Sequence, residues 1–321
     1  MGTVTARLGE LTDLEGAAAL RVGAPVARPG SVYCIGMNYA AHAREGGSEP
    51  PERIVVFMKP SHTLAGPDDD FPASRGAQKL DWEVELALVV GRRAWNLGPD
   101  DDARGVIAGY AVANDISERA WQLEESGGQW SKGKSGPGFL PLGPVLVPTA
   151  DLDPSDLRLR SWVNGEPRQD STTADLIFDI DTIVRDLSTY TVLEPGDVIL
   201  TGTPEGVALS GRFPYLGVGD VMEIDIEAWG DSVRSSSQTG RCDERSALRR
   251  PRGRGHRRHV GDRRRVRRPA AGTRADVAVI DRDVSAGASP ALCLEADVSD
   301  VAAVGPPSPR SSRGGAGSTS S

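Results

Sequence analysis

Two glutamates separated by one residue, Glu83 and Glu85, lie in the run DWEVELALVV. Alternate side chains of a β-strand share a face, so both carboxylates point the same way, on the face that continues into Ala87 and Val89. That face leads into the interior, where unpaired carboxylates are costly, so a cation should meet them. Asp115 ends a neighbouring apolar run and can converge on the pair. Three carboxylates without a nearby Cys or His favour Mg²⁺, Mn²⁺ or Ca²⁺ over Zn²⁺. A Glu-x-Glu pair alone is also typical of a solvated sheet face.

His42 and Glu45 stand three residues apart in the segment IGMNYAAHARE, where the pattern predicts a short helix over residues 38–44. This spacing places both side chains on one helix face. A carboxylate beside an imidazole orients the ring and raises its basicity, as a general base requires. The same spacing is also common among ordinary surface neighbours.

The segment GQWSKGKS, residues 128–135, matches the phosphate-binding pattern GxxxxGKS. That motif needs a buried strand before it and a helix after it. Residues 123–127 are polar, however, and Pro137 and Pro141 prevent a helix from following directly. A nucleotide site is therefore rejected. Lys134 remains a candidate for a buried cation that offsets the carboxylates or stabilises an enolate, the alternative being a solvated loop lysine.

The segment LTGTPEGV ends a predicted strand with a turn. This turn brings backbone groups and the hydroxyl of Thr203 to the strand terminus. A plain turn without a functional role is the alternative.

The elements that must position these residues are mostly strands. Short runs bounded by Gly, Pro, Asp or Asn, many of them β-branched, predict strands at 54–58, 84–90, 106–113, 157–163, 198–201 and 221–226. Helical spacing is found at 38–44, 116–124 and 175–187. The body is therefore predicted to be mixed α/β and mostly β, with helices at its periphery.

Length and composition limit the class of protein. The 321 residues are 38% hydrophobic and 26% charged, and no apolar run approaches the ~20 residues that span a bilayer. The N-terminus lacks the pattern of a secretory signal, so we expect a cytoplasmic protein without a membrane partner. Cys34, Cys242 and Cys293 are too few and too scattered for a disulfide framework or a CxxC metal site.

Charge divides the chain near Gly230. Residues 1–230 carry 19 basic and 35 acidic side chains, whereas residues 231–321 carry 18 Arg and 10 acids. We therefore expect a short N-terminal segment (1–30), a catalytic domain (31–230) and an Arg-rich, low-complexity tail (231–321). An acidic body repels phosphate backbones, so nucleic-acid binding is not expected outside the tail. The tail also lacks the interleaved aromatic residues that such binding uses.

Within the tail, residues 277–283 and 294–300 resemble strand ends of a short-chain dehydrogenase, with Asp281 in the place of the ribose-binding acid. No glycine-rich phosphate turn precedes them. Our hypothesis is that the reading frame runs into a neighbouring dehydrogenase gene. A natural disordered tail is the alternative.

Taken in order, the motifs IGMNYAAHARE, FMKP, DWEVELALVVG, GYAVANDISERAWQ, WSKGKSGPGFLPLGP and LTGTPEGV resemble the fumarylacetoacetate hydrolase family over residues 29–230. The resemblance implies a β-sandwich roll with short peripheral helices, a homodimer, and a bound Mg²⁺ or Mn²⁺, with Ca²⁺ as a third choice. It implies roles for ten side chains. Metal ligands are Glu83, Glu85 and Asp115; catalytic residues are His42, Glu45 and Lys134; substrate-binding residues are Arg119, Gln122, Ser135 and Thr203.

The resemblance implies a site that handles 2-oxo acids. A carboxylate-bound divalent ion stabilises the enolate of such a substrate, and water activated by His42 would cleave the C3–C4 bond of a 2,4-dioxo acid to pyruvate and a carboxylic acid. Isomerisation of 2-hydroxyhepta-2,4-diene-1,7-dioate and decarboxylation of oxaloacetate are alternatives at the same site. The dehydrogenase-like island further suggests 2,4-diketo-3-deoxy sugar acids, whose hydroxyls Gln122, Arg119 and Ser135 would bind.

Overall fold

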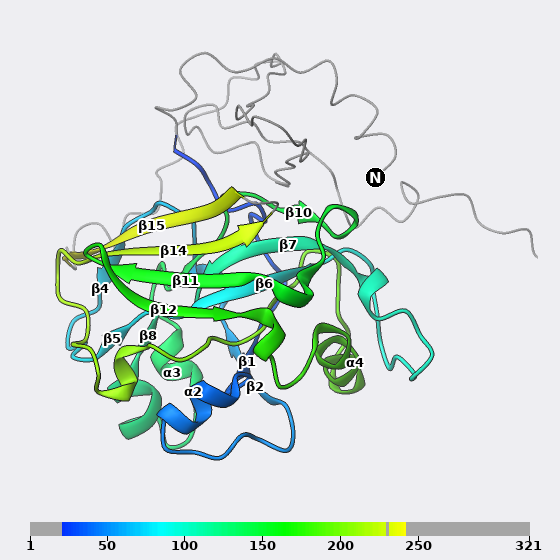
Figure 1. The fold of residues 1–321 in the computed structure, drawn as a ribbon, viewed down its shortest axis with the longest axis horizontal. Helices are drawn as coiled ribbons and strands as arrows, with labels where there is room; N and C mark the ends of the chain where they lie inside the picture. The colour runs from blue at the N-terminus through cyan, green and yellow to red at the C-terminus, as the bar shows by residue number, and fades with distance from the viewer. Residues whose placement is uncertain (1–20, 229–230, 242–321) are drawn as a thin grey trace, which may run out of the picture.

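The computed structural model describes residues 21–228 and 231–241. Two β-sheets pack face to face, with short helices around their rim, so the expected strand-dominated α/β fold is confirmed (Figure 1). The six-stranded sheet has the order β10 (Val147–Pro148), β7 (Ile107–Asn114), β6 (Val84–Val90), β13 (Val198–Leu200), β1 (Val32–Gly36) and β2 (Val55–Lys59). The five-stranded sheet has the order β12 (Glu166–Thr172), β11 (Arg158–Val163), β14 (Val221–Ala228), β15 (Asp231–Arg241) and β4 (Phe71–Ala73).

Two pairs of short strands form separate two-stranded sheets. β3 (Leu64–Ala65) pairs with β9 (Leu140–Pro141), and β5 (Leu80–Asp81) pairs with β8 (Ser117–Glu118). The helices here are equally short. They are α2 (Ala40–Glu45), the π-helical turn η5 (Ala120–Glu124), and α3 (Ser131–Lys134). Within the described ranges, no helix is long and apolar enough to cross a membrane.

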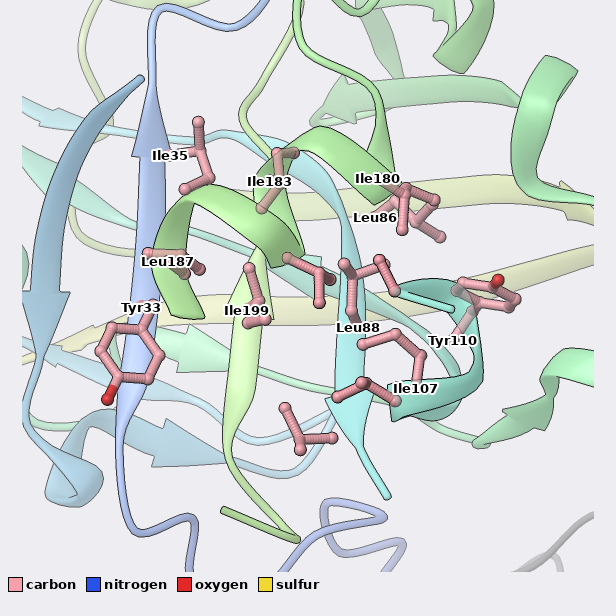
Figure 2. Close-up of a cluster of buried hydrophobic side chains, with 14 of the residues drawn as sticks. Tyr33, Ile35, Leu86, Leu88, Ile107, Tyr110, Ile180, Ile183, Leu187 and Ile199 are labelled. Atoms are coloured by element: carbon pink, nitrogen blue, oxygen red, sulfur yellow. The ribbon is translucent and has the colours of Figure 1, made fainter. Parts of the chain in front are cut away.

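The main core lies between the two sheets and under helix α4 (Ile180–Tyr190). Ile180, Ile183 and Leu187 of α4 pack on side chains of β1, β13, β6 and β7, as Figure 2 shows. Asp179 caps this helix by accepting a hydrogen bond from Thr182 N at 2.8 Å. The helix therefore starts at residue 180 rather than at 175 as expected, and residues 173–175 form a separate 3₁₀ turn.

The helix expected over 116–124 is also shorter than its spacing predicted. Residues 117–118 instead form strand β8, and helical structure begins only at Ala120. The cause is Glu118, whose buried carboxylate accepts hydrogen bonds from Gln78 N, Lys79 N and Trp121 N. The bonds from Gln78 and Lys79 tie the segment to the chain just before β5, and the bond from Trp121 N satisfies an amide in the first turn of η5.

The domain boundary expected at residue 230 is corrected by strand β15. This strand pairs with the full length of β14 and then runs parallel to β4, at Thr239↔Phe71. The Ser-rich sequence of β15 has no hydrophobic alternation, so it did not predict a strand. The strand forms because backbone hydrogen bonds to its neighbours do not depend on the side chains. The Arg-rich stretch after residue 241 and the dehydrogenase-like island lie outside the described residues.

Two truncations test the contribution of β15. We expect a chain that ends at residue 230 to unfold at a clearly lower temperature than a chain that ends at 241, because the shorter chain leaves the edges of β14 and β4 unpaired. Thermal unfolding followed by circular dichroism measures the difference. Equal melting temperatures would show that β15 adds nothing to the fold.

Candidate active site

Antiparallel pairing brings the three predicted metal ligands together. β6 pairs with β7 in a register that sets Val84 opposite Asn114, and Asp115 N donates to Glu83 O at 2.9 Å. Val84 and Leu86 point into the core between the sheets, so Glu83 and Glu85 share the opposite face. Carboxylate oxygens of Glu83, Glu85 and Asp115 all lie within 4.8 Å of one another, and all three residues are buried.

Two lysines and one arginine meet the acids, as their burial required. Lys134 Nζ lies 2.6 Å from Glu83 Oε2 and 2.8 Å from Asp115 Oδ2. Arg119 Nη2 lies 2.6 Å from Glu83 Oε1. Lys59 Nζ, which is fully buried, lies 2.6 Å from Asp115 Oδ1. Burial alone would raise the pKa of Glu83, but Lys134 and Arg119 together hold that pKa at about 2.

Glu85 is held differently from the other two acids. Its Oε2 accepts a hydrogen bond from Gly202 N at 2.7 Å, but no Lys or Arg in the described part of the chain forms an ion pair with it. Burial, followed by the charges of Asp115 and Glu83, raises the pKa of Glu85 well above its usual range. The site therefore lacks positive charge at Glu85, and a divalent cation among these hard oxygen ligands would supply it. The residues present fit such an ion.

The turn after β13 completes this side of the site. Gly202 has φ +100°, and a Cβ there would lie 2.9 Å from the Cβ of Asn38, so glycine is needed for the turn that aims its N–H at Glu85. The Thr203 hydroxyl donates to Val84 O at 2.9 Å and accepts from Gln169 Nε2 at 2.8 Å. Thr203 thus lies at the strand terminus, as the sequence predicted.

These groups line one cavity of about 140 Å³. Of the ten residues predicted for the site, the cavity lining includes seven: His42, Glu83, Glu85, Arg119, Gln122, Lys134 and Thr203. Asp115 is not part of the lining, but its carboxylate contacts Lys134 Nζ at 2.8 Å. Burial lowers the pKa of His42 below its ordinary value, more than the Glu83 charge raises it, so the ring is neutral near neutral pH. Its Nδ1 is buried and forms no hydrogen bond within the described chain.

Two predicted site residues are not where the sequence analysis placed them. Glu45 does not pair with His42, although both lie on α2: its carboxylate accepts from Gly206 N at 2.9 Å and lies 3.4 Å from Arg212 Nη1. Glu45 therefore ties α2 to the loop after Thr203. Ser135 lies outside the cavity lining. It directly follows the short helix α3, and its hydroxyl donates to Ser131 O of that helix at 2.5 Å.

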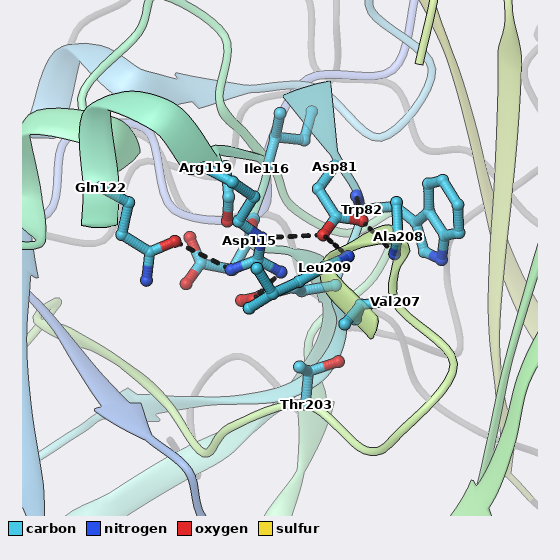
Figure 3. A network of polar contacts seen from close by, with 12 residues as sticks. Asp81, Trp82, Asp115, Ile116, Arg119, Gln122, Thr203, Val207, Ala208 and Leu209 are labelled. Carbon is cyan, nitrogen blue, oxygen red and sulfur yellow. Dashed lines mark hydrogen bonds and ion pairs between the residues drawn. The ribbon is translucent and has the colours of Figure 1, made fainter. Parts of the chain in front are cut away.

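Asp81 and Lys59, for which the sequence predicted no role, lie next to the site in the structure. Asp81 accepts hydrogen bonds from Trp82 N, Ala208 N, Leu209 N and Arg119 Nε, at 2.7–3.0 Å (Figure 3). Arg119 Nη1 in turn donates to Gln122 Oε1 at 2.9 Å. For Lys59, the alternation of β2 was the available signal, because it places Lys59 on the same buried side as Phe57.

Removal of the Asp81 carboxylate should destabilise the fold strongly. In Asp81→Ala, three backbone amides and Arg119 Nε lose a buried acceptor, and breaking a buried ion pair from one side costs about 3–5 kcal/mol. Urea denaturation measures the free energy of unfolding. The control is Asp170→Ala, which removes a comparable Arg–Asp pair with Arg158 at the surface and should cost far less. Equal losses in the two variants would contradict this account.

Comparison with known proteins identifies the family. The family model described as "Fumarylacetoacetate (FAA) hydrolase C-terminal" matches residues 31–236, which include every predicted site residue. The chain belongs to the fumarylacetoacetate hydrolase family. The resemblance in the sequence motifs is thereby confirmed, and this family includes hydrolases, isomerases and tautomerases.

Three relatives show the range of activities in this family. The chain is 41% identical over 209 residues to the mitochondrial oxaloacetate tautomerase FAHD2A of Bos taurus, covering 64% of this chain and 66% of that protein, just under two thirds of its length. A structure of 5-carboxymethyl-2-hydroxymuconate delta-isomerase from Mycobacterium smegmatis is 40% identical, with a TM-score of 0.61 and coverage of 71% of this chain and 84% of that one. Fumarylpyruvate hydrolase from Pseudomonas aeruginosa, solved in complex with Mn²⁺ and pyruvate, is 31% identical, with a TM-score of 0.59 and coverage of 66% and 90%.

Proposed function

We propose that this protein is a divalent-metal-dependent hydrolase that cleaves the C3–C4 bond of a 2,4-dioxo acid into pyruvate and a carboxylic acid. The observation that carries the proposal is one cavity lined by the acids Glu83 and Glu85 and by a neutral His42 with a free ring nitrogen. The related hydrolase solved with Mn²⁺ and pyruvate supports both the class of metal and the product. We propose Mn²⁺ or Mg²⁺ as the ion.

A divalent cation held by Glu83, Glu85 and Asp115 would supply Lewis-acid stabilisation of negative charge on the oxygens of a 2-oxo acid. The side chains perform the remaining steps. His42 accepts a proton from water as the water oxygen attacks the C4 carbonyl. The C3–C4 bond then breaks, its electron pair stays with the pyruvate fragment, and the proton passes to C3. Lys134 and Arg119 keep positive charge beside this site throughout.

Keto–enol tautomerisation of oxaloacetate is the second candidate. It needs a base that moves one proton between C3 and the C2 oxygen, and it needs no attacking water. The relationship to the bovine oxaloacetate tautomerase favours it, as does the absence of a His42–Glu45 hydrogen bond in the described structure. Isomerisation of hydroxydienedioates and decarboxylation of oxaloacetate would use the same enolate chemistry.

A substrate panel separates these reactions. Acetylpyruvate, oxaloacetate and 2-hydroxyhepta-2,4-diene-1,7-dioate are each incubated with Mn²⁺-loaded protein. Pyruvate release and the ultraviolet absorbance of the enol and diene forms are then followed. The proposal expects pyruvate from acetylpyruvate with a higher kcat/KM than any other conversion. A faster loss of oxaloacetate enol, without release of pyruvate, would replace it with the tautomerase assignment.

A further inference from the structure

Apart from His42, the charged groups of the cavity are turned toward one another. Arg119 uses Nε on Asp81, Nη1 on Gln122 and Nη2 on Glu83. Lys134 Nζ is shared between two carboxylates, and the hydroxyl of Thr203 already donates to Val84 O. These groups therefore surround the reacting end of a ligand and offer few hydrogen bonds to a substituent that extends from it.

The rest of the lining is apolar. Apart from Ser48 and small residues, it consists of Ile35, Met37, Phe57, Leu123, Trp130 and Leu209. Phe57 marks where the two parts meet, because Lys134 Nζ lies 5.1 Å from the centroid of its ring. Trp130 follows outward, with its ring centroid 5.8 Å from that of Phe57. Ser48 carries a hydroxyl on the lining and lies on the exposed surface.

Two backbone features build this apolar wall. Gly36, at the end of β1, lets the Trp130 indole lie against the strand, since a Cβ at residue 36 would lie 2.5 Å from the ring. Met37, the next residue, has φ +54°, a left-handed conformation that is strained for a residue with a side chain. Strain of this kind persists only where the surrounding structure imposes it, and here it falls on a residue of the cavity wall.

We propose that this wall binds the acyl substituent at C4, so that the protein prefers 2,4-dioxo acids with an alkyl or aryl tail over those with a hydroxylated tail. The inference rests on the proposed function, because it assumes that the reacting end of the 2,4-dioxo acid lies at the carboxylates. It runs against the sugar-acid substrate suggested by the tail island. Ser135 lies outside the cavity, and Arg119 is held by Asp81, Gln122 and Glu83, so the polar groups of the cavity cluster around the carboxylates rather than along the wall.

The test compares 2,4-dioxooctanoate with a dihydroxylated acid of the same length, and with acetylpyruvate. We expect kcat/KM for the alkyl acid to exceed that for the hydroxylated acid at least about tenfold, since hydroxyls that enter an apolar pocket lose hydrogen bonds to water that the pocket does not replace. Trp130→Ala should reduce this ratio to near one, mainly through KM. Trp95→Ala is the matched control, because Trp95 is 67% exposed and lies outside the cavity lining; it should keep the ratio.

Leu123→Ser provides a second variant if Trp130→Ala does not fold, because Leu123 is 45% exposed and its loss costs little packing. It should also lower the ratio. Equal or better cleavage of the hydroxylated acid by the wild type overturns the inference and leaves the hydrolase assignment intact. If no acid is cleaved, calorimetry of the three acids with Mn²⁺-loaded protein decides. Tighter binding of the alkyl acid retains the inference without the hydrolase, and equal or weaker binding overturns it.

Discussion

Glu85→Gln should lower Mn²⁺ affinity by at least about 100-fold and abolish release of pyruvate. Of the three acids, Glu85 gives the clearest test of metal binding, because it forms no ion pair with a Lys or Arg of the described chain. Replacement of Glu83 or Asp115 would also remove one of the two carboxylates that pair with Lys134 and mix two effects. Glutamine keeps the size of the side chain and an oxygen for Gly202 N. The variant therefore removes mainly the charge that the cation needs.

Isothermal calorimetry with Mn²⁺ measures this affinity without relying on activity. Glu194→Gln is the control, since Glu194 is 52% exposed and pairs with Arg93 on the surface. It should bind Mn²⁺ as the wild type does. Unchanged Mn²⁺ affinity in Glu85→Gln would show that the acidic triad is not the metal site. Glu83→Ala should also lose the metal.

His42→Ala should lower hydrolysis about 10²–10⁴-fold, the usual contribution of a general base, while Mn²⁺ binding stays intact. The pH profile gives the sign of the effect. Because burial lowers the pKa of His42, the ring remains an unprotonated base below the ordinary histidine value of 6.5. The wild-type kcat/KM should therefore begin to fall only when the pH is lowered below 6.5, and His42→Ala should not show this fall.

His62→Ala is the matched control, because His62 is an exposed histidine outside the cavity. It should retain the rate and the pH profile. If His42→Ala cleaved acylpyruvates at the wild-type rate, His42 would not be the base. Retained tautomerisation of oxaloacetate with lost hydrolysis would instead assign His42 to water activation alone.

The acidic triad could be predicted from the sequence because two of its members are placed locally and the third by the pairing of two recognisable strands. The alternation in DWEVE fixes Glu83 and Glu85 on one face whatever the rest of the chain does, and Asp115 follows a strand that pairs with theirs. Lys134 could be predicted only as a candidate, because its burial depends on packing between distant segments. The strands were likewise predictable where β-branched residues stand between turn residues.

The features that the sequence did not predict depend on long-range partners. Glu45 accepts a hydrogen bond from Gly206 N, 161 residues away. The helical spacing of His42 and Glu45 could not predict this bond, because only folding brings the donor close. Asp81 likewise joins Arg119 to the loop at Ala208 through contacts that only the fold creates. β15 lacked hydrophobic alternation, and its position follows from backbone pairing with β14.

Release of pyruvate as a function of bound Mn²⁺ tests the central claim most directly. The full-length protein is dialysed exhaustively against chelator, and acetylpyruvate cleavage is assayed as Mn²⁺ is added back. We expect no pyruvate from the metal-free protein and a rate that rises until one ion is bound per chain. Full release of pyruvate from the chelator-treated protein would contradict a metal-dependent hydrolase built on Glu83, Glu85 and Asp115.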